Sequence, residues 1–444
     1  MIKFFTTYLL KIISSLNLST TSVYRYGTNA FWLFIEQILQ AITGLLVGVW
    51  VARYLGPTNF GLFNYSLAFV ALFKGIAKLG LDGILIRDLV REPEKASIYL
   101  GTAFWLKLFA GIFSICIILL ATLLTKNDPK TNLYIFIISL GIILQSLEVI
   151  DFYFQSKVLL KVISKCKIFQ NILSSIIKII LIIVNAELFW FVLTILIDIF
   201  ILSISYLFLY NYHRNPTFYK YFEIDLAKRL LKDSWPLILT SIAITIYMRI
   251  DQVMLKNLLG DKEVGLYSAA LRLIEKWYFI PGIITQLFFP ALVSAYHDKE
   301  KFYKRLSQLT FFLGYLGLLI SLTLSIFSKF IISLLYGNKY LESAPILSIA
   351  SFTIFILFWM STTSRRQAID FQKIAFLGTV SSAIANILLN LILIPKFGAI
   401  GAAIASLLSF LIAGPFFLFI HPKGRENFFV AIKSLIFPHK VFKP

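Results

Sequence analysis

The chain has 444 residues, of which 59% are hydrophobic and 14% are charged, and its formal net charge is +20. This composition is too apolar for a soluble enzyme, and the apolar runs are longer than the buried strands of a globular core. A helix that crosses a bilayer core of about 30 Å needs about 20 residues. Twelve stretches meet this length, near 28–52, 60–81, 97–124, 132–155, 166–184, 188–210, 234–256, 264–293, 306–334, 344–367, 372–394 and 398–420.

These stretches predict an all-α integral membrane protein with about 12 transmembrane helices in two six-helix lobes around a central cavity. We expect the lobes at 28–210 and 234–420, joined by a cytoplasmic linker at 211–233. The segments 1–27 and 421–444 each carry an apolar helical stripe with polar residues opposite. That pattern is typical of helices that lie on a membrane surface, so both ends are predicted to be cytoplasmic amphipathic anchors.

The positive charge follows the expected topology. With the N-terminus inside, the inward segments hold 27 Lys and Arg, and the outward hairpins hold 7. This bias predicts that both termini are cytoplasmic, in a multi-pass protein of a bacterial cytoplasmic (inner) membrane. Because the basic residues are spread over the inward loops, a nucleic-acid partner is not expected.

An internal repeat relates the two halves of the chain. RYLGPTNFGLFNYSLA, from Arg53, returns as NLLGDKEVGLYSAALR, from Asn257, at an offset of 204 residues. Each copy follows the first long apolar span of its half and leads into another apolar helix. Two halves built on one plan indicate a substrate site between them and an alternating-access mechanism.

Several motifs of other functions are absent from the sequence. There is no Gly-rich phosphate loop that ends in Gly-Lys-Ser/Thr and no Gly-x-Ser-x-Gly elbow. The four His and two Cys are too few and too scattered to indicate a metal site or a disulfide. We therefore expect no catalytic residue, no metal and no cofactor.

Charged residues inside spans are costly, from about 3 kcal/mol upward at the centre of a helix, and mark functional sites or buried partners. Snorkelling towards the membrane surface is the expected behaviour of Lys107 and Lys178. It is a weaker explanation for Arg249, which lies about 22 Å along its helix from Ser234 at 1.5 Å per residue, and for Lys276. These two side chains are expected to face a wet cavity. The full set is Glu36, Lys74, Lys78, Lys107, Lys178, Arg249, Asp251, Arg272, Glu275 and Lys276.

Helical spacing assigns several of these residues to faces. Arg249 continues a polar stripe with Ser241 and Thr245, whereas Asp251 lies two residues further on and is expected to pair with a neighbouring helix. Pro281-Gly282 is predicted to kink or break the eighth span. Asn386 and Asn390 lie one turn apart and are expected to hold helices together.

The spans related by the repeat contribute more cations than carboxylates, so a cavity between them would attract an anion. Arg offers paired donors that suit phosphate. The candidate residues for binding a diphosphate are Arg53, Lys74, Lys78, Arg249, Arg272 and Lys276. The candidates for gating or for coupling to a proton or sodium gradient are Glu36, Asp251 and Glu275. For Glu36, a fixed ion pair between helices remains an open alternative.

Three stretches resemble the polysaccharide-biosynthesis flippases, the Wzx-like O-antigen and exopolysaccharide transporters. They are ARYLGPTNFGLF after the first span, SWPLILTSIAITIYMRIDQVMLKNLLGDKEVGLYSAALRL across spans seven and eight, and IPKFGAIGAAIAS before the last span. This family shares a superfamily with multidrug extruders and lipid II flippases. The resemblance implies a V-shaped cavity between two lobes, with a basic lining that includes Arg53, Arg249 and Arg272.

The resemblance also implies the substrate, an undecaprenyl-diphosphate-linked oligosaccharide that moves from the cytoplasmic to the outer leaflet. Expected partners are this lipid-linked oligosaccharide, membrane lipids, and a polysaccharide polymerase and chain-length regulator of the lipopolysaccharide type of pathway. Two alternatives stay open. One is a cation-coupled multidrug exporter with the same fold, and the other is a polyprenyl-linked glycosyltransferase or polysaccharide polymerase, for which the outward hairpins are short.

Overall fold

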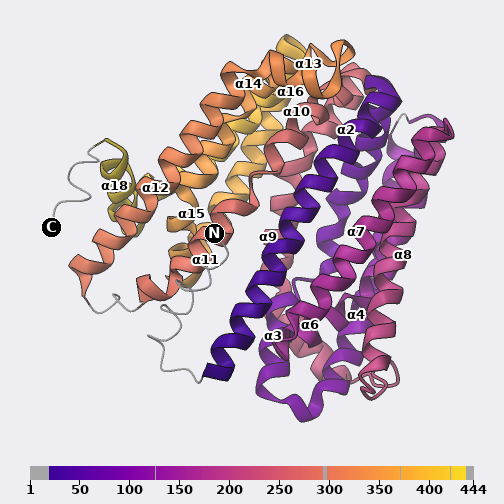
Figure 1. Ribbon diagram of the computed structural model, residues 1–444, viewed down its shortest axis with the longest axis vertical. Coiled ribbons are helices and arrows are strands. Elements are labelled where there is room, and N and C mark those ends of the chain that lie inside the picture. Colours follow the sequence, from indigo (N-terminus) through magenta and orange to yellow (C-terminus); the bar gives the residue numbers. More distant parts are fainter. Residues whose placement is uncertain (1–19, 126, 294–297, 371, 421, 437–444) are drawn as a thin grey trace. The chain divides into compact units, whose positions relative to one another are not determined.

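The computed structural model describes residues 20–125, 127–293, 298–370, 372–420 and 422–436, and all regular structure in these ranges is helical (Figure 1). Most of the predicted N-terminal anchor, residues 1–19, lies outside them. The helices of the first half are α2 (Thr20–Lys78), α3 (Asp82–Arg91), η1 (Pro93–Lys95), α4 (Ala96–Leu124), α5 (Pro129–Leu144), η2 (Gln145–Glu148), α6 (Val149–Ser156), α7 (Leu160–Ile183) and α8 (Leu188–Tyr212). Those of the second half are α9 (Ile224–Leu259), α10 (Asp261–Glu275), α11 (Phe279–Val293), α12 (Lys299–Ile326), α13 (Ser328–Tyr336), η3 (Asn338–Tyr340), α14 (Ser343–Ala350), α15 (Phe352–Asp370), α16 (Gln372–Leu411), η4 (Ile412–Phe416), α17 (Phe417–Ile420) and α18 (Pro422–Ile436).

Nine helical segments of the described chain are long and apolar enough to cross a membrane. Two of them each contain two of the predicted spans, because α2 continues through Gly56 and α16 continues through Gly398 with a non-helical residue at each point. The span predicted at 264–293 is instead two shorter helices, α10 and α11. The chain is therefore an all-helical membrane protein.

The break in the eighth predicted span lies earlier than expected. A turn over residues 276–278 separates α10 from α11, and Pro281 falls in the first turn of α11. Proline is tolerated there because the first amide groups of a helix have no intrahelical acceptor to lose. The prediction of a break was right, but Pro281-Gly282 is not where it occurs.

Five of the described glycines have a positive φ: Gly80, at 58°, lies between α2 and α3, and the other four mark corners between helical segments. Gly56 and Gly260 have φ of 71° and 96°, and Gly337 and Gly398 have φ of 83° and 60°. A side chain is disfavoured at such φ values, so glycine sets the position of each corner. Gly56 and Gly260 occupy matching positions in the internal repeat, and their backbones take similar conformations, with ψ of 170° and −177°.

The chain forms two compact units. The first comprises Met1–Tyr54 and Ser66–Thr245, and the second comprises Leu55–Tyr65 and Ile246–Pro444. In the first unit α7 and α8 run side by side (Figure 1). Helix α4 packs against α5. Its core gathers large buried side chains where α3, α4 and α6 meet the end of α8, among them Phe154, Tyr206 and Phe218. In the second unit α12 packs along α15, and α15 along α16.

Two lysines that were expected to snorkel are paired inside the first unit instead. The Nζ atom of Lys107 lies 3.0 Å from Oε2 of Glu148, and its side chain is only 2% exposed. The Nζ atom of Lys178 lies 2.9 Å from Oδ2 of Asp198. The snorkelling interpretation was wrong for both, because each lysine meets a carboxylate from another helix, which compensates for the desolvation of the charge.

The C-terminal helix α18 packs on its own unit. Its apolar side chains Phe428, Ile432 and Leu435 join a cluster that includes Trp359 of α15. Trp359 Nε1 donates to the carbonyl oxygen of Ala431 at 3.1 Å. The apolar stripe that predicted an anchor thus contacts protein over part of its length, and residues 437–444 lie outside the described ranges.

Candidate functional site

The candidate site residues of the second unit lie on α9 and at the end of α10. Arg249 of α9 and Glu275 of α10 form an ion pair, with Nη1 and Oε1 2.9 Å apart and side chains 31% and 27% exposed. Both residues were predicted from the sequence to face the cavity, but their pairing was not predicted. In this conformation the pair neutralises one of the cations that were expected to attract an anion.

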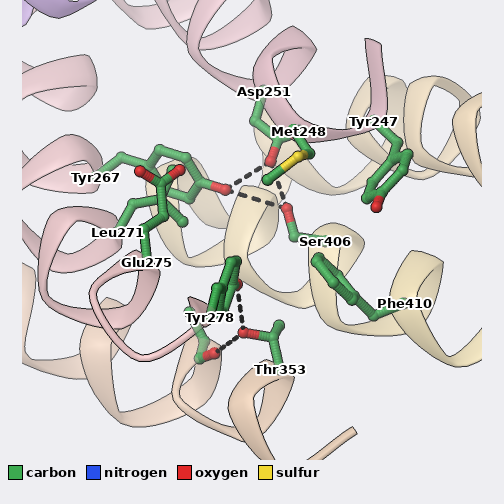
Figure 2. A pocket seen from close by; sticks show the side chains of 11 residues that line it. Tyr247, Met248, Asp251, Tyr267, Leu271, Glu275, Tyr278, Thr353, Ser406 and Phe410 are labelled. Carbon is green, nitrogen blue, oxygen red and sulfur yellow. Dashed lines mark hydrogen bonds between the residues drawn. The ribbon is translucent and has the colours of Figure 1, made fainter. Parts of the chain in front are cut away.

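Asp251 lies two residues beyond Arg249 and is buried in a polar cluster between α9, α10 and α16 (Figure 2). Tyr267 Oη donates to one carboxylate oxygen at 2.5 Å, and Ser406 Oγ donates to the same oxygen. Asn390 Nδ2 donates to the other oxygen at 2.8 Å. As its offset from Arg249 predicts, Asp251 contacts neighbouring helices.

No Lys or Arg forms an ion pair with Asp251 within the part of the chain that the structure describes. A buried charge without a counter-ion is strongly disfavoured, so hydrogen-bond donors, a proton or a cation must compensate for it. The adjoining Asn390 Oδ1 and Asn386 Nδ2 are also buried, and the described residues offer neither atom a hydrogen-bond partner. Beside its carboxylate the cluster therefore has one acceptor and one donor without a hydrogen-bond partner among the described residues.

A small cavity adjoins this cluster. Its volume is about 20 Å³, and a cavity needs at least about 10–15 Å³ to hold one water molecule. Asp251 and Glu275 both line it, together with hydroxyl-bearing side chains; Figure 2 shows Tyr267, Tyr278, Thr353 and Ser406 around it. Tyr278 and Thr353 are joined by a hydrogen bond of 3.0 Å. The cavity is large enough for one water molecule, and its lining combines these oxygen atoms with apolar side chains, among them Met248 and Phe410.

The other two basic candidates of the second unit, Arg272 and Lys276, lie near the end of α10 that carries Glu275. Arg272 is one turn before Glu275, and its guanidinium carbon lies 4.9 Å from the centre of the Phe60 ring. Lys276 directly follows the last residue of α10 and is partly buried. The structure thus brings Arg249 and Glu275 into direct contact, and holds Arg272 against an aromatic ring of the first repeat copy.

The remaining candidates belong to the first unit. Arg53 and Lys78 are exposed, and Lys74 is partly buried in the part of α2 that follows Gly56. All three lie on the helix that carries the first repeat copy.

Glu36 is buried in the first unit, with 2% of its surface exposed. Gln40 Nε2 donates to one of its oxygens at 3.3 Å, and the other oxygen has no hydrogen-bond partner among the described residues. The nearby Lys167 is instead paired with Asp151 at 2.9 Å. The described residues include no ion pair to Glu36.

Sequence analysis missed three side chains of the Asp251 cluster as site residues. Tyr267 and Ser406 look like ordinary polar positions in apolar helices, and Asn390 was interpreted as a contact between helices. Asn390 does bridge helices, but the residue it reaches is Asp251. The sequence did contain a signal: polar side chains in other apolar spans were possible partners for Asp251, for which no partner was predicted. The fold is needed to show which of these side chains contact it.

The sequence matches a family model described as "Polysaccharide biosynthesis protein" over residues 26–275. The chain belongs to this family. It is 24% identical over 396 residues to the capsular polysaccharide biosynthesis protein CapF of Staphylococcus aureus. This alignment covers 87% of this chain and 96% of that protein. It is 32% identical over 169 residues to the probable flippase AglR of Haloferax volcanii, covering 37% of this chain and 35% of that protein.

The fold is similar to that of solved membrane transporters. An inward-facing multidrug resistance transporter of the MATE family matches with a TM-score of 0.67 at 15% identity, over 91% of this chain and 99% of that one. The lipid II flippase MurJ, in an inward closed conformation, matches with a TM-score of 0.55 at 18% identity, over 92% and 90%. The comparisons therefore show a polysaccharide-biosynthesis family and a fold similar to that of these two transporters.

Proposed function

We propose that the protein moves an undecaprenyl-diphosphate-linked oligosaccharide from the cytoplasmic to the outer leaflet by alternating access. The two six-helix lobes, 28–210 and 234–420, rock about a central cavity, while the linker 211–233 and both termini stay cytoplasmic. The diphosphate contacts the basic side chains, the sugars occupy the cavity, and the prenyl chain remains in lipid. The basic candidates are Arg53, Lys74, Lys78, Arg249, Arg272 and Lys276.

The observation that carries this proposal is a set of basic side chains, among them Lys74 and Arg249 in membrane-length helices, in a chain of the polysaccharide-biosynthesis family. A charge in such a helix needs a partner or a polar ligand, and a diphosphate is a polyanion that suits several Arg and Lys donors. Glu275 pairs with Arg249 in this conformation. A diphosphate that approached Arg249 would compete with that carboxylate, so the pair is expected to open when substrate binds.

Asp251 supports a proposal for the energy source. A carboxylate that lies beside a cavity for one small occupant, among hydroxyl and amide oxygens, has the donor set of a site for a proton or a hard monovalent cation. Occupation of this site would be coupled to export if the two lobe conformations bind the cation with different affinities. Glu36 is buried, and one of its oxygens has no hydrogen-bond partner among the described residues. It is the equivalent candidate in the first unit.

A binding measurement on purified protein separates lipid export from drug export. We expect undecaprenyl diphosphate to raise the unfolding temperature of the detergent-solubilised protein by several degrees, since a ligand at 100 times its Kd stabilises the folded state by about 2.7 kcal/mol. Ethidium, an organic cation, should have no such effect. Stabilisation by ethidium and none by undecaprenyl diphosphate would favour the multidrug-exporter alternative.

Membrane topology is predicted by the charge bias. Single cysteines at Asn59, Asn127 and Asn338 should react with a membrane-impermeant maleimide added to intact cells. Cysteines at Lys165 and Lys220 should react only after permeabilisation, and both of these positions are exposed, so burial would not explain their protection. Labelling in the reverse pattern would contradict cytoplasmic termini.

A further inference from the structure

The tip of the first hairpin packs inside the second unit. Residues Leu55–Tyr65 belong to the second unit, although the chain on either side of them belongs to the first. This segment is also the start of the first repeat copy, and it contacts α10, the start of the second copy. The two copies of the repeat are therefore neighbours in space.

Two glycines form this contact in a reciprocal way. A Cβ atom on Gly61 would overlap the carbonyl oxygen of Asp261 and lie 2.8 Å from its carbonyl carbon. A Cβ atom on Gly265 would overlap the carbonyl oxygen of Pro57 and lie 2.8 Å from its carbonyl carbon. Gly61 matches Gly265 in the repeat, and Pro57 matches Asp261 at the same offset of 204. We call this backbone-to-backbone contact, of residues 57–61 with 261–265, the glycine crossing.

Side chains hold the tip beside the glycine crossing. Phe60 is fully buried, under the guanidinium of Arg272 at 4.9 Å and edge-on to the ring of Tyr340 at 6.3 Å. Lys256 Nζ lies 5.8 Å from the centre of the Tyr65 ring. These are cation–π and aromatic contacts, each individually modest. The crossing is thus close-packed but is held by contacts that can separate.

We propose that the glycine crossing is the latch that closes the transporter on its predicted outward side, and that it must separate each time the cavity opens outward. This step rests on the alternating-access transport proposed above. Small residues let helices meet without intervening side chains. A packed contact of this kind has two states, closed or apart, because a close-packed interface does not deform gradually. A methyl group at either glycine would prevent closure and shift the population towards the outward-open state.

The test uses a buried reporter in a chain without native cysteines, with Cys116 and Cys166 replaced by Ala. Val264→Cys places the reporter next to Gly265 at a position that is 0% exposed. In cells without added substrate, Gly61→Ala and Gly265→Ala should each increase its labelling by an external, membrane-impermeant maleimide at least tenfold. The matched control is Gly83→Ala, because nothing lies within 4 Å of a Cβ atom there, and its labelling should be unchanged.

Phe60→Leu provides a variant without added bulk. It removes the ring that contacts Arg272 and Tyr340, and labelling should rise in the same direction by a smaller factor. All variants are first compared by size-exclusion elution, and if the alanine variants do not fold, Phe60→Leu decides. Unchanged labelling in the folded variants would overturn the latch. Labelling is measured without substrate, so it tests the latch separately from substrate binding. If labelling rises in the alanine variants but the protein does not bind undecaprenyl diphosphate, the latch is supported and the proposed function is contradicted.

Discussion

Replacing Arg249 by Ala is expected to reduce export of the lipid-linked glycan at least tenfold, while the protein is still made and inserted. Arg249 lies deep in a membrane helix, where its guanidinium can give two parallel donors to a diphosphate. A tenfold effect corresponds to about 1.4 kcal/mol, which is within the range of one charge-assisted hydrogen bond. The measurement is the fraction of lipid-linked glycan that reaches the outer leaflet in a strain that depends on this chain.

The Ala variant also leaves the Glu275 carboxylate without its partner, so the two effects need separation. Arg249→Lys keeps the charge, loses the paired donors, and should restore export only partly. Glu275→Gln removes the competing carboxylate and should leave binding of undecaprenyl diphosphate intact or tighter. Lys339→Ala, at an exposed cation in the outward hairpin, is the matched control and should export normally. Full export by Arg249→Ala would contradict a role in holding the diphosphate.

Replacing Asp251 by Asn is expected to abolish the response of export to an imposed ion gradient. The side chain keeps its size and can still accept from Tyr267 or Ser406, but it no longer carries the charge that would bind a proton or sodium ion. Asp251→Ala should be worse, because Tyr267, Asn390 and Ser406 would then be buried without their acceptor, at about 1–3 kcal/mol for each unsatisfied group.

The gradient response is measured by imposing sodium and proton gradients separately on membrane vesicles. Ser406→Ala is the control for packing, since it removes one donor and keeps the carboxylate. Glu36→Gln tests the other buried carboxylate in the same assay. If Asp251→Asn retains the full response and Glu36→Gln loses it, coupling resides in the first unit. If neither variant changes the response, neither carboxylate couples transport.

Much of the fold was predictable because bilayer crossing imposes long apolar helices on the sequence. Eleven of the twelve predicted spans overlap the nine membrane-length helices of the described chain, and two of these helices each hold two spans. The span at 264–293 is the departure, since the chain turns at 276–278. Proline at 281 was a poor marker of that turn because it also fits the first turn of a helix. Glycines 56 and 260 were recognisable from the repeat, whereas the corners at 337 and 398 have no matching repeat signal.

The sequence predicted which types of residue form the site, but it did not predict which of them are in contact. Helical spacing placed Asp251 away from Arg249, and Asp251 does contact other helices. The partners of Lys107 and Lys178 come from positions 41 and 20 residues away in the chain, and no periodicity within one helix reveals them. The pairing of Arg249 with Glu275 depends on how α10 packs against α9, which is a property of the fold.

The central claim is tested most directly by locating the lipid-linked glycan in the native host after depletion of this protein. Intact cells are treated with periodate, which oxidises exposed sugars and does not cross the membrane, and the undecaprenyl-linked glycan is then extracted and analysed. We predict that the glycan accumulates and is protected from oxidation in depleted cells, and that wild-type protein restores its accessibility while Arg249→Ala does not. A glycan that is fully accessible in depleted cells, or that is no longer synthesised, would contradict a flippase function.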